Sequence, residues 1–290
     1  MIAAMVAAWL AGSSPAAGAP CQAIAGVSAV WGKRDLRWLI VGETHGTVET
    51  PAAFANLVCL AAAARGPVVV ALEYSVGDQA RIADYLASNG GPAARASLLE
   101  AQIWHNKLQD GRASSAFLTL FDRLRMMMRA GLVKRVVAFQ ASGLSRASGV
   151  SGVAAYEQAM ARTVEQASTN PHELVVALVG NLHAVVKRVT VGTTTYTPMA
   201  GLLPQSSTLT LNAVGAGGSQ WACLRIEGPV RAGLHNGCGV QDFGIDPMPR
   251  PRGVVLGREK EQRWSGRFDL GVKTTASLPA VAPDADAHSE

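Results

Sequence analysis

The 290-residue chain contains little charge and few aromatic side chains. Asp, Glu, Lys and Arg together make up 16% of the residues and Phe, Trp and Tyr 6%, whereas the apolar types make up 49%. This is the opposite of the composition of disordered proteins, and a chain of this length buries a core without disulfide or metal staples. The composition therefore predicts a folded globular protein.

Several motifs that define well-known enzyme classes are absent. The chain has no CxxC pair, no P-loop and no GxSxG motif, and His172-Glu173 lacks the second histidine of an HExxH helix. A zinc ribbon, a phosphate-binding loop, a serine nucleophile elbow and a zincin-type metalloprotease are therefore not supported.

A long uninterrupted apolar run occurs only near the start of the chain. Met1 to Gly12 is apolar, and small residues follow as far as Ala19. This pattern predicts a signal peptide over residues 1–19, with Ala17 and Ala19 as the small residues of the cleavage site. Because about 20 apolar residues are needed to span a bilayer, we expect no transmembrane segment. We expect an exported protein, periplasmic or secreted.

Four cysteines, an even number, agree with export to an oxidising compartment. Cys223 and Cys238 flank a predicted β-hairpin, and a disulfide that closes a loop of about 15 residues contributes roughly 3 kcal/mol. This pairing leaves Cys21 and Cys59 as the remaining pair.

Apolar runs of strand length alternate with helical stretches through most of the chain. The expected strands are 36–41, 68–72, 133–139, 174–179 and 209–214, and the expected helices are 51–64, 77–88, 114–130 and 151–167. Runs that are apolar on both faces are typical of parallel strands covered by helices. The pattern predicts one α/β domain over residues 30–245, with a mainly parallel sheet flanked by helices and a C-terminal β-hairpin. Residues 246–290 are rich in proline and charge, and we expect them to lie outside this domain and to end in a disordered tail over 275–290.

Unusual polar residues follow three of these expected strands. Glu43 and His45 follow the first strand, Glu73 ends the second, and His183 follows the fourth. Because ligands of open α/β sheets bind outside the carboxyl ends of the strands, we expect these side chains in one crevice. A carboxylate beside an imidazole raises the imidazole pKa and fixes its tautomer, which prepares the ring as a base or a metal ligand. We predict that these four residues are catalytic, and that His45, Glu73 and His183 are the ligands if a metal is bound.

Three further residues are expected to contact the substrate. Asn181 lies in the same strand-end segment as His183, although Asn is also a common turn residue. His105 and Arg112 lie in an insertion over residues 89–113, where an arginine could clamp an anion.

Three short motifs occur in a characteristic order. They are Gly42-Glu43-Thr44-His45-Gly46-Thr47, the strand-end Glu73, and Gly180-Asn181-Leu182-His183-Ala184. Together, over residues 35–215, they resemble the EreA/ChaN-like superfamily of erythromycin esterases and haem-binding ChaN lipoproteins, with TIKI/TraB-type metalloproteases as more distant members. The resemblance implies that Glu43, His45, Glu73 and His183 form the site. It implies activated water in the esterases, a divalent metal in the TIKI type and a bound haem in ChaN.

These observations lead to three hypotheses of function. The first is a hydrolase for ester or peptide bonds, in which His45 with Glu43 and Glu73 activates water, directly or as a metal-bound hydroxide, and His183 acts as a general acid or second ligand. The alternative is a haem- or metal-binding uptake protein without catalytic turnover, in which Tyr74 and Trp104 offer apolar contacts. The third is a binding module whose site is intact but idle.

The net charge of +5 does not indicate a nucleic-acid partner. Residues 249–267 contain six Arg and Lys residues against two Glu, an excess of four. This excess follows the expected core and lacks the interleaved aromatic residues of a single-strand binder. We therefore expect a small-molecule or peptide substrate, or haem, and no nucleic acid.

Overall fold

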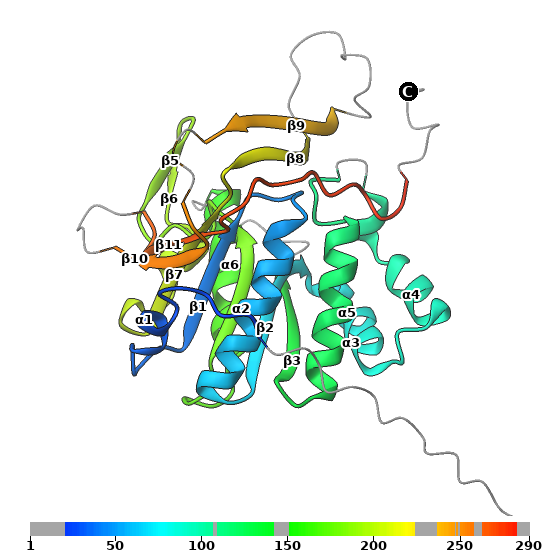
Figure 1. Ribbon diagram of the computed structural model, residues 1–290, viewed down its shortest axis with the longest axis horizontal. Helices are drawn as coiled ribbons and strands as arrows, with labels where there is room; N and C mark the ends of the chain where they lie inside the picture. The colour runs from blue at the N-terminus through cyan, green and yellow to red at the C-terminus, as the bar shows by residue number, and fades with distance from the viewer. Residues whose placement is uncertain are drawn as a thin grey trace, which may run out of the picture.

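A mainly parallel sheet forms the centre of the molecule (Figure 1). The computed structural model describes residues 21–106, 109–141, 151–223, 237–246, 248, 250–257 and 263–282. Within these residues the central sheet has seven strands in the order β10-β11-β7-β1-β4-β2-β3. Neighbouring strands are parallel, except that β10 and β11 are antiparallel. The predicted signal peptide over residues 1–19 lies outside the described residues.

The bounds of the elements agree with the alternation seen in the sequence. The strands are β1 (Trp38–Glu43), β2 (Val68–Ser75), β3 (Val133–Gln140), β4 (Val175–Gly180), β5 (Val189–Val191), β6 (Thr194–Tyr196), β7 (Thr208–Val214), β8 (Gly217–Cys223), β9 (Cys238–Ile245), β10 (Gly253–Leu256) and β11 (Gly266–Asp269). The helices are α1 (Ser28–Trp31), α2 (Glu49–Arg65), α3 (Gln79–Ala87), α4 (Pro92–Leu99), α5 (Ser115–Arg129), α6 (Gly152–Gln166) and α7 (Met199–Leu202). All five expected strands and all four expected helices form, so the predicted α/β class is confirmed.

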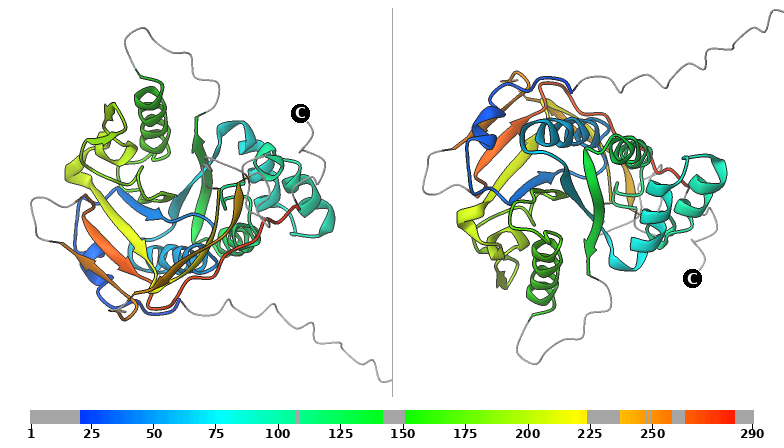
Figure 2. Two further views of the ribbon diagram at one scale, coloured as in Figure 1. Left: turned by 90° about the horizontal axis from the view of Figure 1, so that it is seen from above. Right: turned by 90° about the horizontal axis from the view of Figure 1, so that it is seen from below.

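Helices cover both faces of the sheet, which explains why its strands are apolar on both sides. Figure 2 shows α6 on one side and α2 with α5 on the other. Successive residues of β1 point to opposite faces: Leu39 and Val41 pack in the core beneath α2 and α5, whereas Trp38 and Ile40 pack in the core beneath α6. Because the neighbouring strands from β11 to β3 are all parallel, their carboxyl ends lie at the same edge of the sheet.

The predicted C-terminal hairpin is formed by β8 and β9, which lie above the carboxyl ends of the sheet strands (Figure 1). Cys223 lies opposite Cys238 in the hairpin register, and the two form a disulfide. Cys21 and Cys59 form the other disulfide. Both expected pairings are therefore confirmed.

The packed structure continues beyond the boundary expected at residue 245. Strands β10 and β11 extend the central sheet, because Val254 and Phe268 are buried in the core beneath α2. Ala276 and Pro279 form β-bridges with Thr47 and Ser114, so residues 275–282 lie against the domain rather than in a tail. The prolines and charges between the strands conceal these short apolar pairs in the sequence. Residues 283–290 of the expected tail lie outside the described residues.

None of the helices in the described part of the chain is both long and apolar enough to cross a membrane.

Candidate functional site

The polar residues predicted at three strand ends lie around one cavity of about 340 Å³ at the carboxyl edge of the sheet. The hairpin β8–β9 contributes the opposite wall. The cavity is lined by Glu43, Thr44, His45, Asp110, Gly180, Asn181, Leu182, His183, Gln220, Ala222 and Cys223. A single crevice at the strand ends is the arrangement expected for a ligand site of an open α/β sheet.

Glu43 and His45 form a hydrogen-bonded pair at the end of β1. The two residues are two positions apart at the end of a strand, and Glu43 Oε1 lies 2.9 Å from His45 Nδ1. The Glu43 side chain is buried, and its Oε2 has no hydrogen-bond partner among the described residues. A buried carboxylate on Nδ1 fixes the ring so that Nε2 is the atom available for chemistry.

His183 has a second carboxylate partner, which comes from α6. Glu157 is completely buried, and its Oε1 lies 2.7 Å from His183 Nδ1. Its other oxygen, Oε2, accepts a hydrogen bond of 2.8 Å from the backbone amide of Met199. The site therefore contains two histidines, each held at Nδ1 by a buried glutamate.

Glu73 lies between the two imidazole rings. Its Oε2 is 3.7 Å from His45 Nε2, and its Oε1 is 3.8 Å from His183 Nε2. Both oxygens already have partners: Oε1 accepts from Arg112 Nη1 at 2.9 Å, and Oε2 accepts from the amide of Gly180 at 2.7 Å. Glu73 is thus a fixed negative charge that faces both rings.

Arg112 positions this central carboxylate. Its Nη1 also donates to the carbonyl of Glu73, and its Nε and Nη2 donate to Asp110 at 2.6 to 3.1 Å. The hydroxyl of Tyr74 donates to the carbonyl of Arg112, which attaches the 109–112 segment to β2. Through these contacts Arg112 orients Glu73 in this structure. Its expected contact with a substrate anion stays a prediction.

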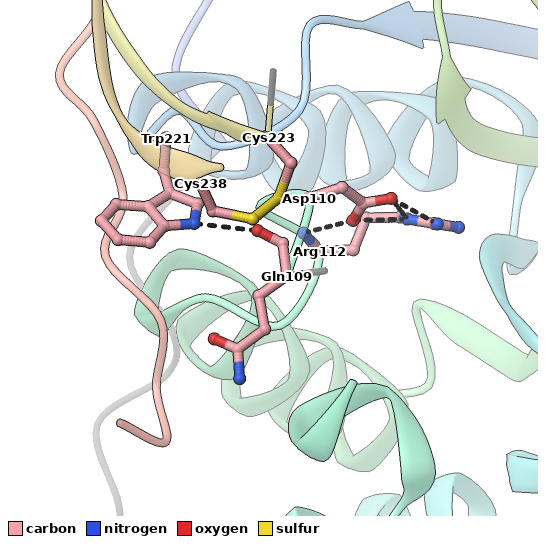
Figure 3. Close-up of a disulfide and its surroundings, with 6 residues drawn as sticks. All are labelled: Gln109, Asp110, Arg112, Trp221, Cys223 and Cys238. Atoms are coloured by element: carbon pink, nitrogen blue, oxygen red, sulfur yellow. Dashed lines mark hydrogen bonds and ion pairs between the residues drawn. A yellow bond between two sulfur atoms is a disulfide. The ribbon is translucent and has the colours of Figure 1, made fainter. Parts of the chain in front are cut away.

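The hairpin disulfide lies directly beside this segment (Figure 3). Trp221 Nε1 donates to the carbonyl of Gln109 at 2.8 Å, while Cys223 lines the cavity with Asp110. The disulfide to Cys238 thereby holds one wall of the site at a fixed place.

The two histidines are stronger bases than an ordinary imidazole. Burial alone lowers the pKa of His45, but the hydrogen bond and charge of Glu43 outweigh it, so the pKa is raised above its usual 6.5. Burial likewise lowers the pKa of His183, but the hydrogen bond that His183 donates to Glu157 and the charge of Glu73 outweigh it, so this pKa is also raised. Each ring therefore binds a proton more readily than an ordinary imidazole does.

The pKa values of Glu43 and Glu73 are shifted in opposite directions, because their surroundings differ. Burial raises the pKa of Glu43 above its usual 4.5, against the hydrogen bond to His45. Burial acts on Glu73 too, but the Arg112 guanidinium, the two histidines and the Gly180 amide outweigh it and lower its pKa. Glu73 therefore remains ionised where the histidines titrate.

Close packing at Gly180 explains why this position lacks a side chain. A Cβ there would lie 2.9 Å from His45 Nε2 and 3.5 Å from His183 Cδ2. Gly46, after His45, adopts a φ of 79°, and a Cβ there would lie 1.9 Å from the carbonyl oxygen of Trp221. Both glycines let backbone and rings approach closely at the site.

Most of the predicted site residues lie around the cavity, but His105 does not. Glu43, His45, Glu73, Asn181 and His183 surround the cavity or its floor, as expected. His105 lies elsewhere: it is exposed, and its Nε2 lies 2.8 Å from the carbonyl oxygen of Leu99.

The aromatic residues considered as haem contacts also lie away from the cavity. Tyr74 and Trp104 are fully buried and pack with Phe117 and Phe121 in the core beneath α5. They support the 109–112 segment from below rather than lining the cavity.

Two site residues were not predicted from the sequence. Glu157 belongs to the buried stripe of α6 with Met160, Ala161 and Val164, so helical periodicity places this charge among apolar residues. That mismatch is the signal that identifies it. Tyr156 lies with its ring centroid 5.9 Å from that of His183, and burial and the Glu73 charge raise its pKa to about 12.

The donor set does not fit a divalent metal. Among the described residues no group of three or more His, Cys, Asp or Glu side chains is arranged to hold a metal ion. The shared carboxylate Glu73 is already bound by the cationic Arg112, which opposes a second cation nearby.

No protein-family model matches the chain. No curated protein matches it either.

Solved structures, in contrast, share its architecture. A mutant of erythromycin esterase EreC in an open conformation matches with a TM-score of 0.56 and 12% identity, over 87% of this chain and 92% of that one. A Bacillus cereus protein matches with a TM-score of 0.56 and 8% identity, over 88% and 93%. A succinoglycan biosynthesis protein matches with a TM-score of 0.52 and 9% identity, over 87% and 91%. A bacterial protein toxin also matches, with a TM-score of 0.40 and 20% identity, over 61% of this chain, and the chain spans only 34% of the toxin's length.

The class defined by these findings is an α/β protein with paired histidines and glutamates at the carboxyl edge of its sheet. Its fold is the EreA/ChaN-like fold, as the sequence motifs led us to expect. At identities of 8 to 12% the likeness concerns the fold.

Proposed function

We propose that the protein is an exported hydrolase in which His45 activates water for attack on an ester or peptide bond. One observation carries the proposal: two histidines, each held at Nδ1 by a buried glutamate, face one shared carboxylate beside a cavity. Pairs of titratable groups held in this way are typical of general acid–base catalysis.

His45 is the base in this proposal. In its neutral form Nδ1–H donates to Glu43, and the Nε2 lone pair takes a proton from water as the oxygen attacks the carbonyl carbon. Glu43 and Glu73 stabilise the imidazolium that forms. The side chain of Asn181, which lines the cavity, is the donor assigned to the developing oxyanion.

His183 is the acid. Its Nδ1 is held by Glu157, and in the protonated form Nε2–H gives its proton to the leaving oxygen or nitrogen as the bond to the carbonyl carbon breaks. The proton taken up by His45 then returns to solvent or to His183, so that both rings regain their starting states. Glu73 is not assigned as the base, because Arg112 and Gly180 lower its proton affinity.

The compartment forms part of the same proposal. The two disulfides support an oxidising environment outside the cytosol, in agreement with the signal peptide expected over residues 1–19. Among proteins of the same fold, one is named for its action on erythromycin as an esterase, which makes esters the first substrates to test.

The experiment is a panel of p-nitrophenyl esters and peptide p-nitroanilides, assayed with the purified wild-type chain, His45→Asn and His172→Asn. His172 is exposed and lies outside the cavity, so its variant is the matched histidine control. We expect hydrolysis of at least one substrate by wild type and His172→Asn, and its loss in His45→Asn.

Two further measurements distinguish the alternatives. Activity that persists after incubation with EDTA supports water activation by the side chains, whereas loss that Zn²⁺ restores supports a metal-bound hydroxide. The uptake hypothesis would replace the hydrolase hypothesis if the wild-type chain hydrolysed no substrate of the panel and gave a Soret band on adding haem that His45→Asn did not give.

A further inference from the structure

A second cavity, of about 360 Å³, lies at the other end of the sheet from β3. It is formed by β7, β10, β11 and the residues just before β11, and it shares no lining residue with the candidate active site. Its size is within the range of about 300 to 1,000 Å³ that is usual for small-molecule sites.

Two arginines of this cavity have side-chain nitrogens without an acceptor in the described part of the chain. The Arg263 guanidinium lies 5.3 Å from the centre of the Trp264 ring, and its side chain has no acceptor among the described residues. Arg267 donates to Asp269 only through Nε, at 2.8 and 2.9 Å. Its terminal nitrogens likewise have no acceptor in the described part of the chain. Planar guanidinium groups of this kind bind carboxylates, sulfonates and phosphates.

A polar residue of β7 also lines the cavity. It is Asn212, which lies within the strand, next to β11 in the sheet.

An aromatic ring forms a further wall. Trp264 Nε1 donates to the carbonyl of Asn181 at 3.0 Å, so the indole is held in one orientation. Val255, which is 54% exposed, adds apolar surface beside it. The same hydrogen bond connects this cavity with the segment that carries Asn181 and His183.

We infer that this cavity binds a small anion that carries a planar ring. The anionic group pairs with Arg263 and Arg267, and the ring packs against Trp264. This site is independent of the proposed hydrolysis.

The test uses 8-anilinonaphthalene-1-sulfonate, which has an anion and fused rings, and the uncharged N-phenyl-1-naphthylamine, which lacks only the sulfonate. Each is titrated fluorimetrically into the purified full chain. We expect saturable binding of the sulfonate, about tenfold or more tighter than that of the neutral analogue, because charge-assisted hydrogen bonds are worth that much.

Variants locate the binding. Arg263→Gln is expected to weaken the sulfonate about tenfold, whereas Arg129→Gln, on α5, and His45→Asn leave it unchanged. Arg267→Gln should also weaken it, and the melting temperature shows whether this variant remains folded. The inference is overturned if the sulfonate does not bind saturably, if the neutral analogue binds as tightly, or if Arg263→Gln binds like Arg129→Gln.

Discussion

Substitution of Glu157 by glutamine should change the proton chemistry of His183 while leaving the shape of the site nearly intact. In the native site one oxygen of Glu157 faces His183 Nδ1 and the other accepts from the Met199 amide. In the variant the amide oxygen must face the Met199 N–H, because two donors cannot face each other. The new NH₂ group then faces Nδ1, which has to become an acceptor. The ring is forced into the neutral form that carries its proton on Nε2.

The size of the effect follows from the lost charge. A hydrogen bond to a charged group contributes about 1.5 to 3 kcal/mol, and one pKa unit corresponds to about 1.4 kcal/mol. The pKa of His183, which Glu157 raises against the effect of burial, should therefore fall by about one to two. Since the folded pKa lies above the usual 6.5, the pairing stabilises the fold fully below pH 6.5 and is lost as the pH rises through the folded value. The variant should lose more stability, relative to wild type, at pH 6 than at pH 9.

The assay is a histidine titration by two-dimensional NMR, together with urea unfolding at both pH values. Glu173→Gln is the matched control: Glu173 is also buried and paired, with Lys134 and Arg135, but it lies away from both histidines of the site. It should lower stability without moving the His183 titration. An unchanged pKa of His183 in Glu157→Gln would refute the electrostatic argument.

Three further predictions address the rest of the site. The kcat/KM of wild type should rise with pH as His45 loses its proton, because His45 must be neutral to act as a base, and should fall again as His183, the acid, loses its proton. Because Glu43 raises the pKa of His45, a rise centred well below 6.5 would contradict this. Gly180→Ala should lower kcat/KM by about tenfold to 100-fold with an unchanged circular dichroism spectrum, because the added Cβ displaces His45 Nε2. Gly77→Ala is the control: the nearest atom to its added Cβ is 3.4 Å away, and we expect its kcat/KM to stay unchanged. Replacing Cys223 and Cys238 by serine should lower the free energy of unfolding by about 3 kcal/mol in guanidinium titrations and raise KM. Replacing Cys21 and Cys59 by serine should lower the free energy of unfolding by about 4 kcal/mol and leave KM unchanged. If both replacements raised KM equally, the hairpin would not form a wall of the substrate site.

The sequence was sufficient for the sheet because its parallel strands are apolar on both faces. Runs such as 174–179 have no other stable place than between two helical layers. The strand-end positions of Glu43, Glu73 and His183 then predicted their convergence, since the carboxyl ends of parallel strands meet at one edge.

The remaining features depend on contacts that no local pattern reveals. Strands β10 and β11 are four residues each; β11 pairs with the distant β7, and β10 pairs with β11. The role of Arg112 follows from a contact with Glu73, 39 residues away, and that of Glu157 from one with His183, 26 residues away. Local propensity does not encode such pairs, although a charge on the apolar stripe of a helix, like Glu157, indicates that one exists.

The central claim is that His45 activates water, and the most direct test is the ratio of kcat/KM between His45→Asn and His172→Asn at pH 8 on the best substrate of the panel. General base catalysis contributes about 10² to 10⁴ in rate, so we expect the ratio to lie at or below about 0.01. A ratio near one, with wild type active, would contradict the account.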